Sequence, residues 1–97
     1  EDYVIDRLKG DGFDSPDWYG NEWEMDCETD GYRIEVASLN QKKYLLSVKD
    51  GYKEIDLKVP GVKDFRSDRA GNGYHWTNYE KLLTDVEKVI IYLHKKG

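Results

Sequence analysis

Residues 22–36 read EWEMDCETDGYRIEV, and this stretch decides the fold. Every second residue is apolar or aromatic on both sides of Asp30-Gly31, a dipeptide that favours a two-residue hairpin turn of type I′. A turn centred there places Cys27 opposite Ile34, and the other apolar residues also face one another. We therefore predict an antiparallel hairpin with one apolar face and one charged face.

The same alternation continues along the chain, around a second Asp-Gly dipeptide at residues 50 and 51. A two-residue turn centred on this dipeptide pairs Leu46 with Ile55. The next apolar pair in that register is Tyr44 with Leu57. We therefore predict a four-stranded antiparallel β-meander with strands at about 21–28, 32–38, 43–49 and 52–59.

The connections between the predicted strands differ in length. The connection after the second strand must hold an odd number of residues if Val36 and Tyr44 are to share a face, so we expect a loop with a bulge over 38–42. The connection over 60–76 is long and contains several turn residues. A short edge strand at 73–76 would fit it.

The C-terminal part of the chain has the three- and four-residue apolar spacing of one helix face. Thr77-Asn78-Tyr79-Glu80 matches a capping box with Thr77 as the N-cap, which predicts a helix over 78–95. A short N-terminal helix is predicted over 2–9. The fold class is therefore α+β, with the C-terminal amphipathic helix packed on one face of the sheet in a single domain over 1–97. The predicted core is Trp23, Met25, Cys27, Ile34, Val36, Tyr44, Leu46, Val48, Ile55, Leu57, Val59, Leu82, Leu83, Val86 and Ile90.

Charge is divided unevenly along the chain. Residues 1–40 hold twelve acidic and three basic side chains, whereas residues 41–97 hold eight acidic and twelve basic ones. The summed field of such a charge distribution steers partners and repels wrong ones, although it does not name a partner. We therefore interpret the chain as a non-enzymatic interaction or regulatory protein, of the inhibitor, immunity or anti-defence type, that binds a basic protein surface.

The acidic strand of the first hairpin is the predicted binding surface. Its four carboxylates would lie on one face at steps of about 7 Å, where they could meet a basic protein or imitate a phosphate backbone. The alternative is a solvated edge strand whose charges prevent edge-to-edge pairing. The predicted partner-binding residues are Glu22, Glu24, Asp26 and Glu28, with Asp14, Asp17 and Trp18 from the preceding turn-rich segment.

A second hypothesis is a single-stranded nucleic-acid-binding module. It would use the lysines of the second hairpin together with arginine and aromatic residues of the loop at 61–76, because guanidinium and planar groups suit phosphate contacts and base stacking. The alternative for the loop is that its aromatic residues pack under the helix while its arginines are solvated. The residues of this hypothesis are Lys43, Lys49, Lys58, Arg66, Arg69, Tyr74, His75 and Trp76.

Other chemistry is not expected. Cys27 is the single cysteine and His75 and His94 are the two histidines, which is too few ligands for a structural zinc site. The sequence has no nucleophile elbow or phosphate-binding glycine loop, so we expect no enzyme activity, metal or cofactor. No apolar run is long enough to cross a membrane, and the absence of a cysteine pair fits a cytoplasmic protein, either a monomer or a homodimer.

Overall fold

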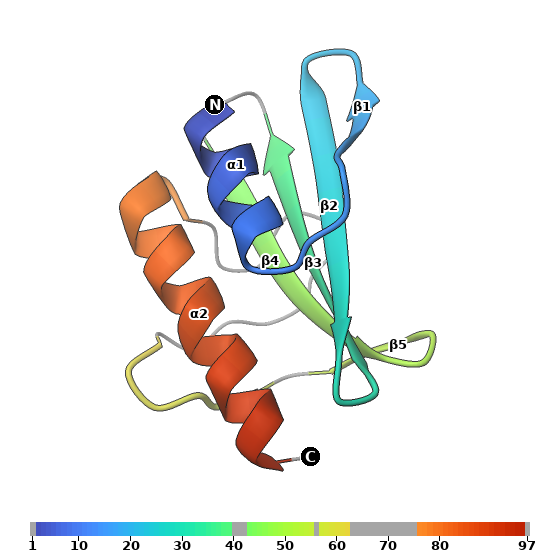
Figure 1. Cartoon of the computed structure of the whole chain (residues 1–97), viewed down its shortest axis with the longest axis vertical. Helices are drawn as coiled ribbons and strands as arrows, with labels where there is room; N and C mark the ends of the chain where they lie inside the picture. The colour runs from blue at the N-terminus through green and yellow to red at the C-terminus, as the bar shows by residue number, and fades with distance from the viewer. Residues whose placement is uncertain (1, 40–42, 56, 63–75, 97) are drawn as a thin grey trace.

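The computed structural model of the chain describes residues 2–39, 43–55, 57–62 and 76–96. Within them, five antiparallel strands form one sheet in the order β1-β2-β3-β4-β5, and two helices accompany it (Figure 1). The elements are α1 (Asp2–Gly10), β1 (Asp17–Tyr19), β2 (Glu22–Thr29), β3 (Tyr32–Leu39), β4 (Lys43–Asp50), β5 (Lys53–Ile55) and α2 (Tyr79–Lys96). The predicted α+β meander is confirmed, with β1 as a fifth strand.

Both helices lie on the same face of the sheet, which we call the inner face (Figure 1). They also contact each other: Arg7 of α1 forms an ion pair with Glu87 of α2 at 3.1 Å, and the rings of Tyr3 and Tyr79 meet edge to face at 5.8 Å. Among the described residues, no helix or strand lies on the opposite, outer face. The two ends of the described chain are thus joined over the inner face.

The first hairpin has the predicted register. Cys27 lies opposite Ile34, and the neighbouring apolar residues pair in the same way. Asp30 and Gly31 have φ angles of 53° and 85°. Positive φ at both central residues is the mark of a type I′ turn, whose twist matches that of the strands.

The predicted register of the second hairpin is wrong by two residues. Asp50 pairs with Lys53, so the turn residues are Gly51 and Tyr52. Gly51 has a φ of 69°, and Tyr52 is not among the positive-φ residues, which is the pattern of a type II′ turn with glycine at its first central position. A shift of two residues leaves each side chain on the same face, so Ile55 still packs against the core.

Two segments pair with β4 along the edge that faces away from β3. At its C-terminal half β4 pairs with β5, which covers 53–55 rather than the predicted 52–59. At its N-terminal end Tyr44 forms an antiparallel bridge with Trp76, with N···O distances of 2.8 and 3.0 Å between the two backbones. Trp76 therefore takes the place that the sequence analysis gave to Leu57.

The connection between β3 and β4 holds an odd number of residues, as predicted. Leu39 pairs with Lys43, which leaves three residues between the strands, and Val36 lies opposite Leu46 on the face that Tyr44 shares. The predicted bulge falls largely on residues 40–42, outside the described part of the chain. Residues 73–75 of the predicted edge strand also lie outside it.

The core lies between the sheet and the two helices. All predicted core residues are buried except Ile55 and Ile90, which are partly buried against it. The additions come chiefly from α1, from the segment next to each helix and from the last turns of α2. They are Val4, Ile5, Leu8, Phe13, Val62, Trp76, Val89 and Leu93.

Helix α2 begins one residue later than a Thr77 cap would give. The side-chain oxygen of Asn78 accepts hydrogen bonds from the backbone N–H groups of Glu80 at 2.8 Å and Lys81 at 3.2 Å. Asn78 is therefore the N-cap, and it satisfies two amides that have no partner within the helix. Thr77 precedes it as an exposed residue.

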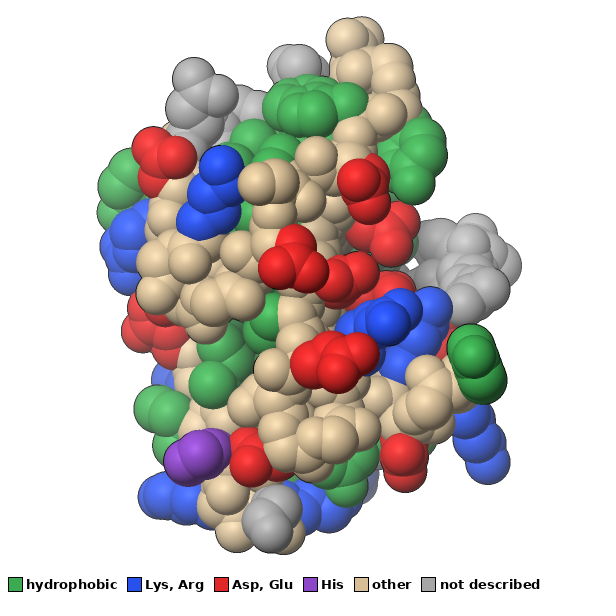
Figure 2. Space-filling view, turned by 45° about the vertical axis from the view of Figure 1, so that its right-hand side comes forward, with side chains coloured by type: hydrophobic (Ala, Val, Ile, Leu, Met, Phe, Trp, Pro, Cys, Tyr) green, Lys and Arg blue, Asp and Glu red, His purple; other side chains and the backbone are tan. Residues whose placement is uncertain are grey.

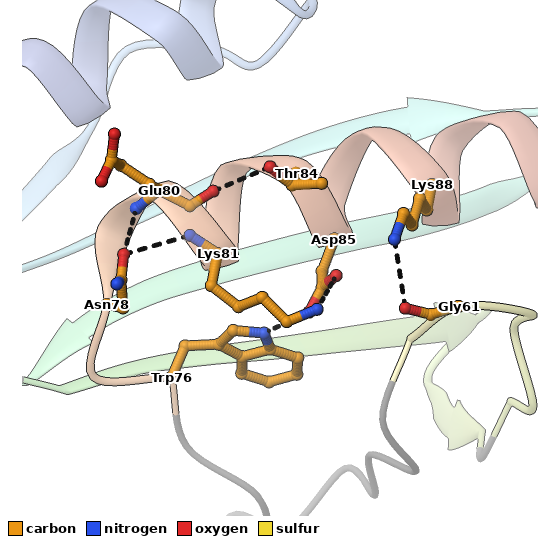
Figure 3. Close-up of polar contacts among 8 residues, drawn as sticks. All are labelled: Gly61, Trp76, Asn78, Glu80, Lys81, Thr84, Asp85 and Lys88. Carbon is orange, nitrogen blue, oxygen red and sulfur yellow. Dashed lines mark hydrogen bonds and ion pairs between the residues drawn. The ribbon is translucent and has the colours of Figure 1, made fainter.

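A buried polar contact fixes α2 on the sheet (Figure 3). The carboxylate of Asp85 is fully buried and accepts a hydrogen bond from the indole Nε1–H of Trp76 at 2.7 Å. The ammonium group of Lys81 reaches the other carboxylate oxygen at 2.9 Å from the solvent side. A buried carboxylate is costly unless it is paired and hydrogen-bonded, and these two contacts meet that requirement. Trp76 thus connects α2 to the backbone of β4.

We predict that Trp76→Phe lowers the free energy of unfolding by about 1–3 kcal/mol, because Asp85 stays buried after losing one of its two donors. Urea unfolding followed by far-UV circular dichroism measures the change. Trp18→Phe, at an exposed tryptophan, is the matched control and should change stability by less than about 0.5 kcal/mol. Equal effects of the two substitutions would contradict this role of Trp76.

Candidate functional site

The acidic residues of β2 share the outer face of the sheet. Along β2 they alternate with Trp23, Met25 and Cys27, which are all buried on the inner face. Because side chains alternate across a strand, the acidic row must point the other way. The predicted one-sided row is therefore present, and it consists of Glu22, Glu24, Asp26 and Glu28.

Neighbouring segments bring further carboxylates to this row. Asp17 of β1 lies opposite Glu24, and Glu35 of β3 lies opposite Asp26. The backbone N–H of Asp14 donates to the carbonyl oxygen of Asp26 at 2.9 Å, which brings this residue beside the row. Figure 2 shows acidic side chains gathered across the middle of the surface on the side of β1 and β2. We call the group of Asp14, Asp17, Glu22, Glu24, Asp26 and Glu35 the acidic patch.

Crowding in the acidic patch alters the ionisation of its members. Partial burial raises the pKa of Glu24 above its ordinary value, and the charge of Glu35 raises it further, although Lys49 acts in the opposite direction. Partial burial also raises the pKa of Asp26, with smaller contributions from Glu35 and Asp14, although Arg33 acts in the opposite direction. Burial is the main cause of both raised pKa values, and repulsion between neighbouring carboxylates adds to it.

Basic side chains neutralise only one border of the acidic patch. Arg33 forms an ion pair with Glu28 at 3.4 Å. Lys49 forms an ion pair with Glu35 at 3.2 Å, and the side chains of Lys49 and Glu35 are each 15 % exposed. No described basic side chain forms an ion pair with Glu24 or Asp26. Among the described residues, the carboxylates in the middle of the patch consequently have no basic partner.

The two aromatic residues of β1 point to opposite faces. Trp18 lies opposite Trp23, so it belongs to the inner-face side and is 51 % exposed at the sheet edge. Tyr19 lies opposite Glu22, on the outer face, and is 64 % exposed. The structure thus separates Trp18 from the acidic patch and adds Tyr19, which the sequence analysis missed because it did not predict a strand at 17–19.

The residues of the nucleic-acid hypothesis do not gather among the described part of the chain. Lys43 begins β4, Lys58 follows β5, and Lys49 is paired with Glu35. Trp76 is 1 % exposed, so its ring is not available for base stacking. Four further residues of this hypothesis lie outside the described residues: Arg66, Arg69, Tyr74 and His75.

Cys27 is a buried thiol, and its environment does not favour the reactive thiolate. Burial raises its pKa to about 11, assisted by nearby acids such as Asp26. A thiol with a raised pKa is a poor nucleophile at neutral pH. Within the described residues, no group of three or more His, Cys, Asp or Glu side chains is arranged to hold a metal ion. No described helix is long and apolar enough to cross a membrane.

Comparison of the chain with protein-family models, with curated proteins and with solved structures found no significant match. The acidic patch and its surroundings are therefore the basis for proposing a function.

We predict that the double substitution Glu24→Gln with Asp26→Asn raises the free energy of unfolding at pH 7 by roughly 1 kcal/mol, because opposed like charges on neighbouring strands are destabilising. A carboxyl group whose pKa is higher in the folded state than in the unfolded state lowers the free energy of unfolding at pH values above its folded-state pKa. The cost disappears as the pH falls below the unfolded value near 4. The advantage of the variant should therefore shrink between pH 7 and pH 4.

Urea unfolding at several pH values and salt concentrations measures this advantage. It should also shrink as salt is added, because exposed charges are screened. Asp6→Asn with Asp50→Asn, at exposed acids outside the patch, is the control for the change in net charge. A site variant less stable than the wild type at pH 7 would refute the prediction.

Proposed function

We propose that this protein is a non-enzymatic interaction protein, of the inhibitor, immunity or anti-defence type, that binds a basic protein surface through the acidic patch. The observation that carries the proposal is that no described basic side chain pairs with Glu24 or Asp26, which lie among neighbouring carboxylates on a sheet face that no described helix or strand covers. Natural sheets usually place opposite charges across such positions. Here the row Asp17, Glu24 and Asp26 keeps one sign across two strands.

A basic partner would relieve the repulsion within the patch. Lysine or arginine side chains from the partner would pair with carboxylates that no described basic side chain pairs with. The same field would steer the partner to this face and raise the association rate, an effect that falls with ionic strength. Binding would also weaken at acidic pH, because protonation of Glu24 and Asp26 begins at a higher pH than for ordinary carboxyls.

An inhibitor or immunity protein of this kind acts by covering a surface. It needs no catalytic group, cofactor or metal, only a rigid array of charges complementary to the partner. The central strands β2 and β3 supply such rigidity, because they are paired over seven residues and one face of each is packed into the core. The partner's basic surface would then be closed to its own acidic target.

The test is charge reversal at Glu22, Glu24 and Asp26 together, each replaced by Lys. Isothermal titration with polyarginine at low and then at 150 mM salt measures binding. We expect the site variant to lose at least tenfold more affinity than a control with the same net charge, in which Asp6, Asp50 and Glu80 are replaced by Lys. Circular dichroism shows whether both variants keep the native fold.

Equal losses in the two variants would mean that net charge alone attracts polyarginine, and would contradict the proposal. A parallel titration with a single-stranded oligonucleotide, followed by tryptophan fluorescence, examines the alternative function. Saturable binding that weakens steeply with salt would indicate phosphate contacts and would favour the nucleic-acid hypothesis instead.

A further inference from the structure

The outer face of the sheet is not acidic throughout. Where β3 ends and β4 begins, some outward positions are small or apolar: Ala37 lies opposite Leu45, and Leu39, the last residue of β3, lies opposite Lys43. The side chains of Ala37, Leu39 and Leu45 are partly exposed. The outer face therefore has a carboxylate side over β1 and β2, which Glu35 of β3 extends, and a small apolar side of Ala37, Leu39 and Leu45 where β3 ends and β4 begins. The other outward residues of β3 and β4 are polar: Arg33, Lys43, Ser47 and Lys49.

The apolar side interrupts the expected pattern of a solvated sheet face. In an antiparallel sheet with one face open to water, outward positions are normally polar. The outward positions of β2 follow this rule, whereas Ala37, Leu39 and Leu45 do not. No described helix or strand lies over them. An apolar centre with a polar border is the usual anatomy of a protein interface.

Two kinds of occupant are excluded by physical reasons. A second copy packed face to face about a two-fold axis would bring two acidic patches into one interface, where their charges repel. A strand added at the edge of β1 would find only three residues to pair with, preceded by Pro16, which has no backbone N–H to donate. An occupant of this face therefore has to be basic where it meets the acidic patch, and it contacts side chains rather than the edge of β1.

A single helix has the dimensions that this face requires. Neighbouring strands lie about 4.8 Å apart, so the row from Glu24 on β2 through Ala37 to Leu45 on β4 spans about 10 Å. An α-helix with its side chains is about 10–12 Å across. One helix lying along the strands would thus cover the carboxylates and the apolar pair together, as α2 covers the inner face.

We propose that the partner presents a cationic amphipathic helix to the outer face. Its apolar side chains would rest on Ala37 and Leu45, and its lysine or arginine side chains would meet Glu24 and Asp26. This inference rests on the proposed function and adds the form of the partner to it. Apolar contact supplies affinity that salt does not screen, and the carboxylates set the orientation.

Two synthetic helical peptides of 14 residues and equal positive charge test the inference. One carries leucines along one face and lysines along the other; in the second, every leucine is replaced by glutamine. We expect the leucine peptide to bind at least tenfold more tightly in isothermal titration. Its binding should persist at 1 M salt and show a negative heat-capacity change, the mark of apolar burial. Equal affinities for the two peptides would overturn the inference.

Variants of the protein locate the contact. Leu45→Gln should weaken the leucine peptide about tenfold and leave the glutamine peptide unchanged. Ile91→Gln, at an exposed apolar residue of α2 on the other side of the molecule, is the matched control and should change neither affinity. Urea unfolding establishes that both variants are folded. An unchanged affinity of Leu45→Gln for the leucine peptide would overturn the inference.

The same titrations separate the inference from the proposed function. If charge reversal at Glu22, Glu24 and Asp26 abolishes binding of both peptides while Leu45→Gln has no effect, the proposed function stands and the amphipathic helix is refuted. If charge reversal leaves both peptides bound as before, the acidic patch is not the binding surface and both proposals fail.

Discussion

Burial of one face of the sheet under α2 is the constraint on which the rest of the structure depends. Along each strand the side chains alternate, so the covered face receives residues such as Met25, Val36 and Leu46, and the intervening residues must face outward. The acidic row is a direct result of this geometry. A register shift of one residue would carry its carboxylates into the core, where the cost of burial would prevent folding.

The contact between Trp76 and Asp85 positions the N-terminal part of α2 on the sheet. The indole donates to a fully buried carboxylate of α2 while its own backbone pairs with Tyr44 of β4. One residue therefore belongs to both layers, and it sets the position of the first turns of α2 over the sheet. Lys88 adds a second connection through the carbonyl oxygen of Gly61 at 3.2 Å (Figure 3).

The parts of the fold that could be predicted depend on short-range rules. Alternation placed the apolar face and the acidic row, and Asp30-Gly31 determined the first turn. The second turn was misplaced because Gly51 can serve as the last central residue of one turn type or the first of another. The place opposite Tyr44 is taken by Trp76, a contact between residues far apart in sequence that the alternation pattern does not reveal. The position of Tyr19 beside the acidic patch depends instead on a short-range signal that the sequence analysis did not use: Tyr19 pairs with Glu22 across the two-residue turn Gly20-Asn21.

The contact between α1 and α2 has a consequence for biosynthesis. A ribosome delivers α1 and the meander before α2, so the inner face of the sheet remains without its main cover until the last segment of this sequence has emerged. The ion pair between Arg7 and Glu87 therefore joins a residue that is synthesised early to one that is synthesised late. During translation the nascent chain would therefore expose an apolar surface of native hairpins, which is the kind of surface that chaperones recognise.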